Sequence, residues 1–230
     1  MVPGASTLTY LFDGANDDPL ADEVAGWLTA SPRFRAFADE HRDKIRKKLR
    51  GATDAEARRD VRTELRVAQL LLADRRMEVA FEAYGSRQPG PDFTVTLRGD
   101  RFNLEVTRLR GDPAATGFGG LLAKVRQLPP SVPNAVVFAI EGSDAAAYDI
   151  GAAVRTVRAR ADRKDDALFT ARGFAGSRGF HDRFARLGAA FAWANGAVGE
   201  TRAKTWANPA ARIAFPQRAA RAVRACLTEG

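Results

Sequence analysis

Apolar and polar residues alternate along residues 91–107, where the sequence reads PDFTVTLRGDRFNLEVT. Two alternating runs, residues 93–98 and 101–107, flank Gly99-Asp100, a dipeptide typical of the two-residue turn of a β-hairpin. That turn pairs Arg98 with Arg101 and Asp92 with Thr107. Because side chains alternate along a strand, the register separates two faces. The apolar face carries Phe93, Val95, Leu97, Phe102, Leu104 and Val106, and the polar face carries Asp92, Thr94, Thr96, Asn103, Glu105 and Thr107.

Two carboxylates lie near the open end of this hairpin. In the expected register Asp92 and Glu105 are diagonal neighbours, whose Cβ atoms lie about 5–8 Å apart. Two carboxylates at that separation can bind one divalent cation. The alternative is an ordinary amphipathic hairpin with a solvated polar face.

Upstream of the hairpin, the sequence from Asp60 to Met77 has a helical period. Val61, Leu65, Ala68 and Leu72 form its apolar stripe. Glu64 falls at the edge of that stripe. Burying an unpaired charge is costly, so Glu64 should meet a cation, a metal or hydrogen-bond donors. A structural ion pair with one of the many arginines is the alternative.

The rest of the pattern predicts an α/β chain with one domain. Residues 19–49 are expected to be helical, with Gly51 as the stop and Trp27, Leu28, Phe34, Phe37, Ile45 and Leu49 buried. Further helices are expected at 117–128, 144–162 and 217–227, strands at 134–141, 188–195 and 202–206, a turn at 196–200 and a mobile loop at 165–179. Residues 1–55 would be an N-terminal helical extension packed on a core of residues 56–230.

These elements and residues resemble a known superfamily. Glu64 on a helix, Pro91-Asp92 opening a strand and Glu105-Val106-Thr107 on the next strand resemble the PD-(D/E)XK, or restriction-endonuclease-like, nucleases. The resemblance covers residues 64–140 and extends more loosely to Trp206-Ala-Asn-Pro. The chain is also similar to uncharacterised bacterial members of the superfamily that have Glu-x-Thr in place of Glu-x-Lys. It implies a restriction-endonuclease-like core of helix, mixed β-sheet built on the hairpin, helix and strand, with residues 56–230 as the nuclease domain.

The resemblance also implies a metal site. Asp92, Glu105 and the backbone carbonyl of Val106 would bind Mg²⁺ or Mn²⁺, and Glu64 would complete the shell directly or through water. The metal would support hydrolysis of phosphodiester bonds in nucleic acid, and DNA rather than RNA is the expected substrate.

Thr107 departs from the superfamily pattern, which has Lys at this position. A Thr hydroxyl can orient a water molecule, but it cannot neutralise charge. Lys124, at the margin of the next helix's apolar face, is the candidate replacement, and a snorkelling surface lysine is the alternative reading. Arg108 has the opposite parity to Thr107 and should point to the other side of the sheet. If no lysine reaches the site, the chain would be a catalytically inactive nuclease-fold module that binds nucleic acid or a protein.

Charge agrees with a nucleic-acid partner. The 230-residue chain has 36 Lys and Arg against 28 Asp and Glu, a formal net charge of +8, which favours polyanions. Basic residues cluster at 42–50, 155–164 and 172–186, although such runs are also typical of solvated helix faces. The expected nucleic-acid contacts are Lys44, Arg46, Lys47, Lys48, Arg172 and Arg178. A homodimer would let two sites cut two strands.

Sequence motifs that are absent from the chain exclude several classes of protein. The single cysteine, Cys226, excludes a disulfide framework and a Cys-rich zinc site and favours a reducing cytoplasm. No P-loop or dinucleotide fingerprint is present. No apolar run approaches the roughly 20 residues that span a bilayer, and the first residues lack the basic start of a signal peptide, so no membrane partner is expected.

Overall fold

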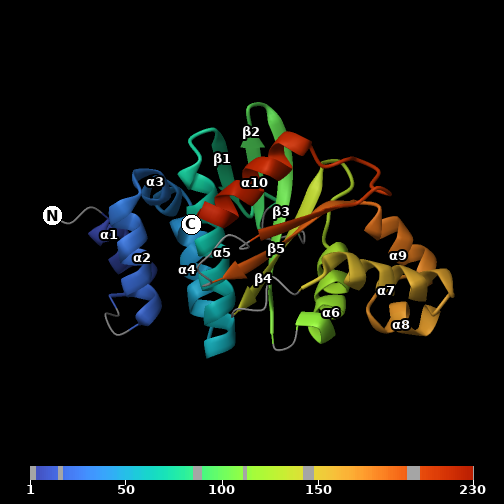
Figure 1. Cartoon of the computed structure of the whole chain (residues 1–230). Coiled ribbons are helices and arrows are strands. Elements are labelled where there is room, and N and C mark those ends of the chain that lie inside the picture. The colour runs from blue at the N-terminus through green and yellow to red at the C-terminus, as the bar shows by residue number, and fades with distance from the viewer. Residues whose placement is uncertain are drawn as a thin grey trace.

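The computed structural model describes residues 4–14, 18–84, 90–110, 113–141, 148–195 and 203–229. The described residues form ten helices and six strands in a mixed α/β arrangement (Figure 1). The helices are α1 (Ala5–Leu11), α2 (Pro19–Ala30), α3 (Pro32–Glu40), α4 (Arg42–Gly51), α5 (Ala55–Ala73), α6 (Pro113–Val125), α7 (Ile150–Asp162), α8 (Asp166–Ala171), α9 (Gly176–Phe184) and α10 (Gln217–Glu229). The strands are β1 (Met77–Phe81), β2 (Phe93–Leu97), β3 (Asp100–Leu109), β4 (Asn134–Glu141), β5 (Leu187–Asn195) and β6 (Ala203–Ala207).

One mixed sheet contains all six strands, in the order in which they occur along the chain. β1, β2 and β3 are antiparallel, β3, β4 and β5 are parallel, and β6 returns antiparallel to β5. Helix α6 makes the crossover between the parallel strands β3 and β4, because parallel neighbours need a long connection. The predicted α/β class and the predicted hairpin are therefore confirmed.

The register of the hairpin differs from the prediction. Leu97 pairs with Asp100, so the two-residue turn is Arg98-Gly99 and not Gly99-Asp100. Both turn residues have positive φ, 51° and 91°, as this kind of hairpin turn requires. Moving the turn by one residue shifts every pair by two positions, which leaves the assignment of side chains to the two faces unchanged. Extended by one residue, the register sets Asp92 directly opposite Glu105.

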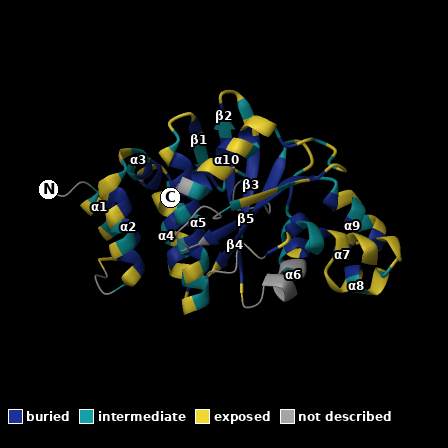
Figure 2. Cartoon of the chain, viewed as in Figure 1, coloured by how far each residue is buried: buried dark blue, intermediate teal, exposed yellow. Residues whose placement is uncertain are grey.

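Helices cover both faces of the sheet. The apolar residues of α5 and α10 pack with those of α1–α4 against one face, which includes Val95, Phe102 and Leu104. Helices α6, α7, α8 and α9 pack against the other face, which includes Val136 and Phe138. Figure 2 shows the buried strands between these two layers, with the exposed residues on the outer sides of the helices.

The N-terminal helical segment consists of three helices rather than one. Pro32 begins α3, and the Ser31 hydroxyl caps it by accepting a hydrogen bond from the Phe34 amide at 3.1 Å, which is a typical helix start. A further break at His41 separates α3 from α4. The six positions predicted to be buried are all buried: Trp27, Leu28, Phe34, Phe37, Ile45 and Leu49.

The predicted mobile loop at 165–179 is wrong. The segment forms α8 and the start of α9, and the rings of Phe169 and Phe180 stack with centroids 4.8 Å apart. Asp166 joins the two helices by accepting hydrogen bonds from the amide and hydroxyl of Ser177. Burial of the phenylalanines therefore outweighs the local glycine content.

The remaining boundaries follow the predictions with small shifts. Helices α6, α7 and α10 and strands β4, β5 and β6 lie where helices and strands were expected. Helix α1 and strand β1 were not predicted. The turn expected at 196–200, and the beginning of the helix expected at 144–162, lie outside the described residues.

Candidate functional site

Three predicted carboxylates meet where β2 begins beside β3, between α5 and α6. Asp92 immediately precedes β2, Glu105 lies on β3, and Glu64 comes from α5. Asp92 and Glu105 are 8% and 1% exposed. Glu64 has 16% of its side chain exposed. Burial of this many acidic groups requires partners for each of them.

Backbone amides orient the Asp92 and Glu105 carboxylates. Asp92 Oδ2 accepts a hydrogen bond from the Val106 amide at 2.8 Å. Glu105 Oε2 accepts one from the Asp92 amide at 3.1 Å. These reciprocal bonds between the start of β2 and β3 follow from the observed register, in which the two residues are opposite each other rather than diagonal.

Lys124 points from α6 to this pair. Its Nζ lies 2.5 Å from Glu105 Oε1, and 22% of its side chain is exposed. Thr107, two residues beyond Glu105 on the same strand, is half-buried and has the same parity. Lys124 therefore places an ammonium next to Glu105, and Thr107 contributes to the lining of the neighbouring pocket.

Lys48 of α4 also belongs to the cluster, although the sequence analysis predicted it to be a nucleic-acid contact. Its Nζ forms an ion pair with Glu64 and lies 3.3 Å from Asp92 Oδ1 and 3.2 Å from Glu82 Oε1. The i, i+4 spacing of Lys44 and Lys48 is the signal that could have shown this. Both lysines face the end of β1, because Lys44 Nζ donates to the carbonyls of Phe81 and Glu82 at 2.8 and 3.0 Å.

Charge within the cluster is not balanced. The three buried carboxylates Glu64, Asp92 and Glu105 and the two ammonium groups of Lys48 and Lys124 carry one net negative charge when all five are ionised. The more exposed Glu82, beside Lys48, adds a second negative charge. Burial, with the Asp92 charge added, raises the pKa of Glu64 to about 8 and that of Glu105 to about 7. The metal-free cluster therefore tends to hold a proton near neutral pH.

The two lysines respond to the same environment. Burial alone would lower the pKa of Lys48 and of Lys124. Burial is the largest single effect, but the neighbouring carboxylates together outweigh it and raise both pKa values above the ordinary lysine range. These carboxylates are Glu64, Asp92 and Glu82 for Lys48, and Glu105, Asp92 and Glu64 for Lys124. Both side chains are therefore cations in the folded protein.

A pocket of about 340 Å³ opens beside the carboxylates. Its lining includes the predicted site residues Glu64, Val106, Thr107 and Lys124. Arg108, Arg110, Asp60 and Thr63 complete it. The pocket is polar, and Asp92 and Glu105 do not line it, so a substrate group in the pocket meets the cluster at Glu64 and Lys124.

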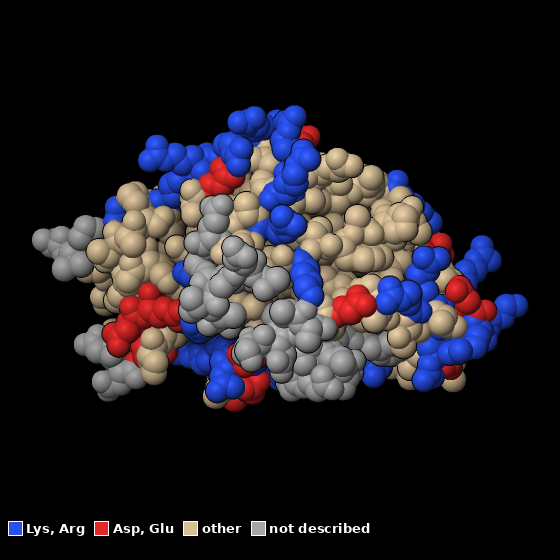
Figure 3. Space-filling model, in the orientation of Figure 1, with Lys and Arg blue, Asp and Glu red and all other residues tan. Residues whose placement is uncertain are grey.

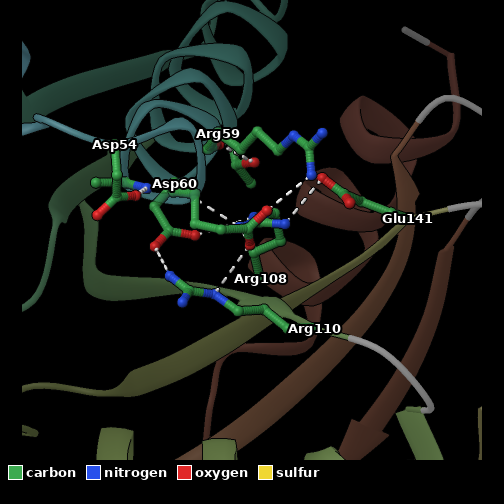
Figure 4. Close-up of polar contacts among 9 residues, drawn as sticks. Asp54, Arg59, Asp60, Arg108, Arg110 and Glu141 are labelled. Carbon is green, nitrogen blue, oxygen red and sulfur yellow. Dashed lines mark hydrogen bonds and ion pairs between the residues drawn. The ribbon is translucent and has the colours of Figure 1, made fainter.

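One wall of the pocket is an ion-pair network between α5 and the sheet (Figure 4). Arg108, with 1% of its side chain exposed, bonds to Asp60 at 3.0 Å, to Glu56, and to Glu141 at 3.1 Å. Arg110 bonds to Asp60 at 2.5 Å. Arg108 thus points toward α5, as its parity predicts.

The carboxylate oxygens of the cluster are the donors available to a divalent cation. Within the described residues no three His, Cys, Asp or Glu side chains are arranged to hold a metal ion. The reason is visible in the contacts, because the Lys48 ammonium lies between the Glu64 and Asp92 carboxylates. Carboxylate oxygens that converge on one cation suit Mg²⁺ or Mn²⁺ in chemistry. The residues therefore fit a metal if the Lys48 ammonium leaves that position.

The predicted nucleic-acid residues do not form one surface. Lys44 and Lys48 are engaged as described above, and Arg46 pairs with Asp13. Lys47 is exposed on α4. Arg172 and Arg178 are exposed after α8 and on α9, at the opposite end of the molecule from α4 (Figure 1).

Comparison with protein-family models, with curated proteins and with solved structures gives no match for this chain. Among the residues that the structure describes, no helix has the length and hydrophobicity needed to cross a membrane.

Proposed function

We propose that this protein is a divalent-metal-dependent nuclease of the PD-(D/E)XK type that hydrolyses phosphodiester bonds in nucleic acid, with DNA rather than RNA as the proposed substrate. The observation that carries the proposal is the arrangement of Asp92 and Glu105. The two carboxylates lie opposite each other, are held by reciprocal backbone hydrogen bonds, and have the Lys124 ammonium against Glu105. This is the acid pair plus lysine that the chemistry requires.

The order of elements supports the same proposal. Helix α5 is followed by the antiparallel strands β1, β2 and β3, by α6, and by β4 parallel to β3. This order agrees with the core expected from the resemblance: a helix, a mixed sheet built on the hairpin, a helix and a strand. The carboxylates lie on the elements that the resemblance assigned to them.

Each side chain has a separate role in the proposed reaction. Asp92, Glu105 and the Val106 carbonyl would hold Mg²⁺ or Mn²⁺, with Glu64 as a further oxygen donor. The bound ion would polarise the scissile phosphate and make a water molecule more nucleophilic. Lys124 stabilises negative charge that develops on the phosphate, and the Thr107 hydroxyl orients water in the pocket.

The test is cleavage of supercoiled plasmid, linear duplex, single-stranded DNA and RNA in Mg²⁺ or Mn²⁺. Asp92→Asn and Glu105→Gln should each lower the rate by more than about 100-fold, since even loss of a residue behind a metal ligand costs 10–100-fold. Lys124→Met should lower the rate while metal binding persists. Asp100→Asn, at the other end of the hairpin, is the matched control and should cut like wild type.

A second function is favoured by Lys48. An ammonium that already neutralises Glu64 and Asp92 suits a nuclease-fold module that does not bind metal and instead binds nucleic acid or a protein partner. Failure of the wild-type protein to cut any of the four substrates, with salt-sensitive binding retained by all three site variants, would favour this module over the nuclease.

The proposed location is the cytoplasm, and the proposed assembly is a homodimer. The single cysteine, Cys226, is buried and forms no disulfide, which suits a reducing compartment. Two copies would present two sites to the two strands of a duplex. Sedimentation with and without duplex DNA tests the assembly.

A further inference from the structure

A second pocket, of about 220 Å³, lies at the far end of the hairpin from the carboxylates. Four arginines line it: Arg76 before β1, Arg98 in the β2–β3 turn, and Arg218 and Arg221 on α10. Leu97 and two alanines of α10 supply the rest of the lining. We call this site the arginine pocket. Figure 3 shows Lys and Arg side chains gathered along the upper edge of the molecule, where Figure 1 shows α10 and the end of β2.

Most of the charge in the arginine pocket is not neutralised. Arg76 pairs with Asp74 at 2.6 Å. In the described parts of the chain, Arg98, Arg218 and Arg221 have no ion pair or hydrogen bond with any other side chain, and all three are exposed. Like charges held together repel one another, so an anion at this position would relieve the repulsion.

The backbone conformation of Arg98 is energetically unfavourable for a residue with a side chain. Arg98 has φ of 51° in the first position of the two-residue turn, where Asn, Asp or Gly is preferred. A side chain with a Cβ is disfavoured in that conformation. On α10, Arg218 and Arg221 are three residues apart and therefore share one face of the helix. The turn and the helix thus direct three guanidinium groups to one place.

The chemistry of the lining selects phosphate. Guanidinium groups bind phosphate oxygens in a bidentate manner. The lining has no aromatic ring on which a base could stack and no amide or carboxylate that could read a base edge. Several arginines from separate elements suit a row of phosphates, which in a duplex follow one another every 3.4 Å or so along each strand.

We propose that the arginine pocket is a sequence-independent anchor for the phosphate backbone of nucleic acid, separate from the carboxylate cluster. Asp92 and Leu97 are five residues apart on an extended strand, which corresponds to about 17 Å. The anchor therefore contacts a different stretch of the nucleic acid from the one at the cluster. This inference rests on the nucleic-acid partner of the proposed function and does not depend on hydrolysis.

The test measures binding without cleavage. Fluorescence anisotropy of a labelled duplex of arbitrary sequence is recorded in EDTA between 50 and 200 mM KCl, for wild type and for Arg98→Gln/Arg218→Gln/Arg221→Gln. Loss of three phosphate contacts should lower the slope of log Kd against log salt by about 2–3 and weaken binding at least about 10-fold at the lowest salt. A second, unrelated duplex should give the same result.

A matched triple variant controls for net charge. Arg59→Gln/Arg126→Gln/Arg212→Gln removes the same charge from exposed positions outside the three basic clusters and outside the arginine pocket, and it should keep the wild-type salt slope. Equal losses in the two triple variants, or no loss in the first, would overturn the proposal. So would arginine-dependent binding to phosphatidylserine vesicles without binding to the duplex. Because cleavage is assayed separately in Mg²⁺, an inactive protein that still loses DNA binding in the first variant would refute the nuclease and support the anchor.

Discussion

Replacing Lys48 with methionine tests whether its ammonium occupies the place of a metal ion. Methionine keeps the unbranched aliphatic stem, which suits packing, and removes the charge. The change leaves Glu64, Asp92 and Glu105 with Lys124 as the remaining cation of the cluster, so full ionisation would give a net charge of −2 instead of −1.

The magnitude follows from burial. Side chains of Lys48 and Glu64 are 24% and 16% exposed, and breaking such a buried pair costs up to about 3–5 kcal/mol. The pKa of Glu64 is already about 8, so this carboxyl can take up a proton at pH 7 and limit the cost to about 2 kcal/mol. For a domain of this size that corresponds to a fall in Tm of about 4–8 °C.

Lys48→Met should be less stable than wild type without metal, but it should bind a divalent cation more tightly. A divalent cation that binds wild type must first displace the ammonium, whereas in Lys48→Met the position is open. The same 2 kcal/mol should therefore appear as roughly 30-fold tighter Mn²⁺ binding. Titration calorimetry with MnCl₂ and thermal unfolding in EDTA or MnCl₂ measure the two effects. Lys47→Met, on the exposed side of α4, is the control and should change neither.

Two results would refute this reasoning. Equal Mn²⁺ affinity in wild type and Lys48→Met would show that the ammonium and the cation do not compete. An unchanged Tm in EDTA would show that the contacts of Lys48 with Glu64 and Asp92 do not stabilise the metal-free fold. Tighter Mn²⁺ binding without any cleavage would separate the capacity to hold metal from catalysis and favour the inactive module.

Two further predictions concern the surroundings of the cluster. Arg108→Met should lower the free energy of unfolding by about 2–4 kcal/mol, because the guanidinium is buried, whereas Arg110→Met, 55% exposed, should change it by less than about 1 kcal/mol; urea unfolding measures both, and equal effects would contradict the difference in burial. The pH dependence follows from Glu64 and Glu105, whose pKa values rise from 4.5 to about 8 and about 7. The folded state therefore binds more protons, and the stability that this gives is complete below pH 4.5 and lost as the pH rises through 7–8. Urea unfolding in EDTA should show lower stability at pH 8.5 than at pH 6 in wild type, and Glu64→Gln/Glu105→Gln should lose most of this difference; the same difference in the variant would contradict the assignment.

The polar alternation of the hairpin was sufficient to predict which residues share a face. Its turn was placed one residue too late because Gly99-Asp100 and Arg98-Gly99 both contain the glycine that a tight turn uses, and a sequence does not show that Arg98 adopts positive φ. The facial assignment remained correct because a shift of the turn by one residue moves partners by two. The contact of Asp92 with Glu105 depended on parity more than on register.

Long-range contacts were less predictable than local ones. Strand β1 is five residues long, and its alternating Met77, Val79 and Phe81 are too few to outweigh the helical period that precedes them. The glycines of residues 165–179 favoured the prediction of a loop where α8 and the start of α9 lie. The phenylalanines that pack these two helices together are separated along the chain. In both places the tertiary packing decides the structure, and local propensity does not report it.

Lys48 shows why a site cannot be assigned from the core motif alone. The expected boundary at residue 55 places Lys48 in the N-terminal extension, yet its ammonium contacts two of the three core carboxylates. Lys44, one turn earlier on α4, binds the carbonyls at the end of β1 and so fixes α4 against the sheet. A metal cation can contact Glu64 and Asp92 only when α4 or the Lys48 side chain moves away from these two carboxylates. The extension therefore belongs to the site, and the competition between one ammonium and one metal ion decides whether these carboxylates bind a metal.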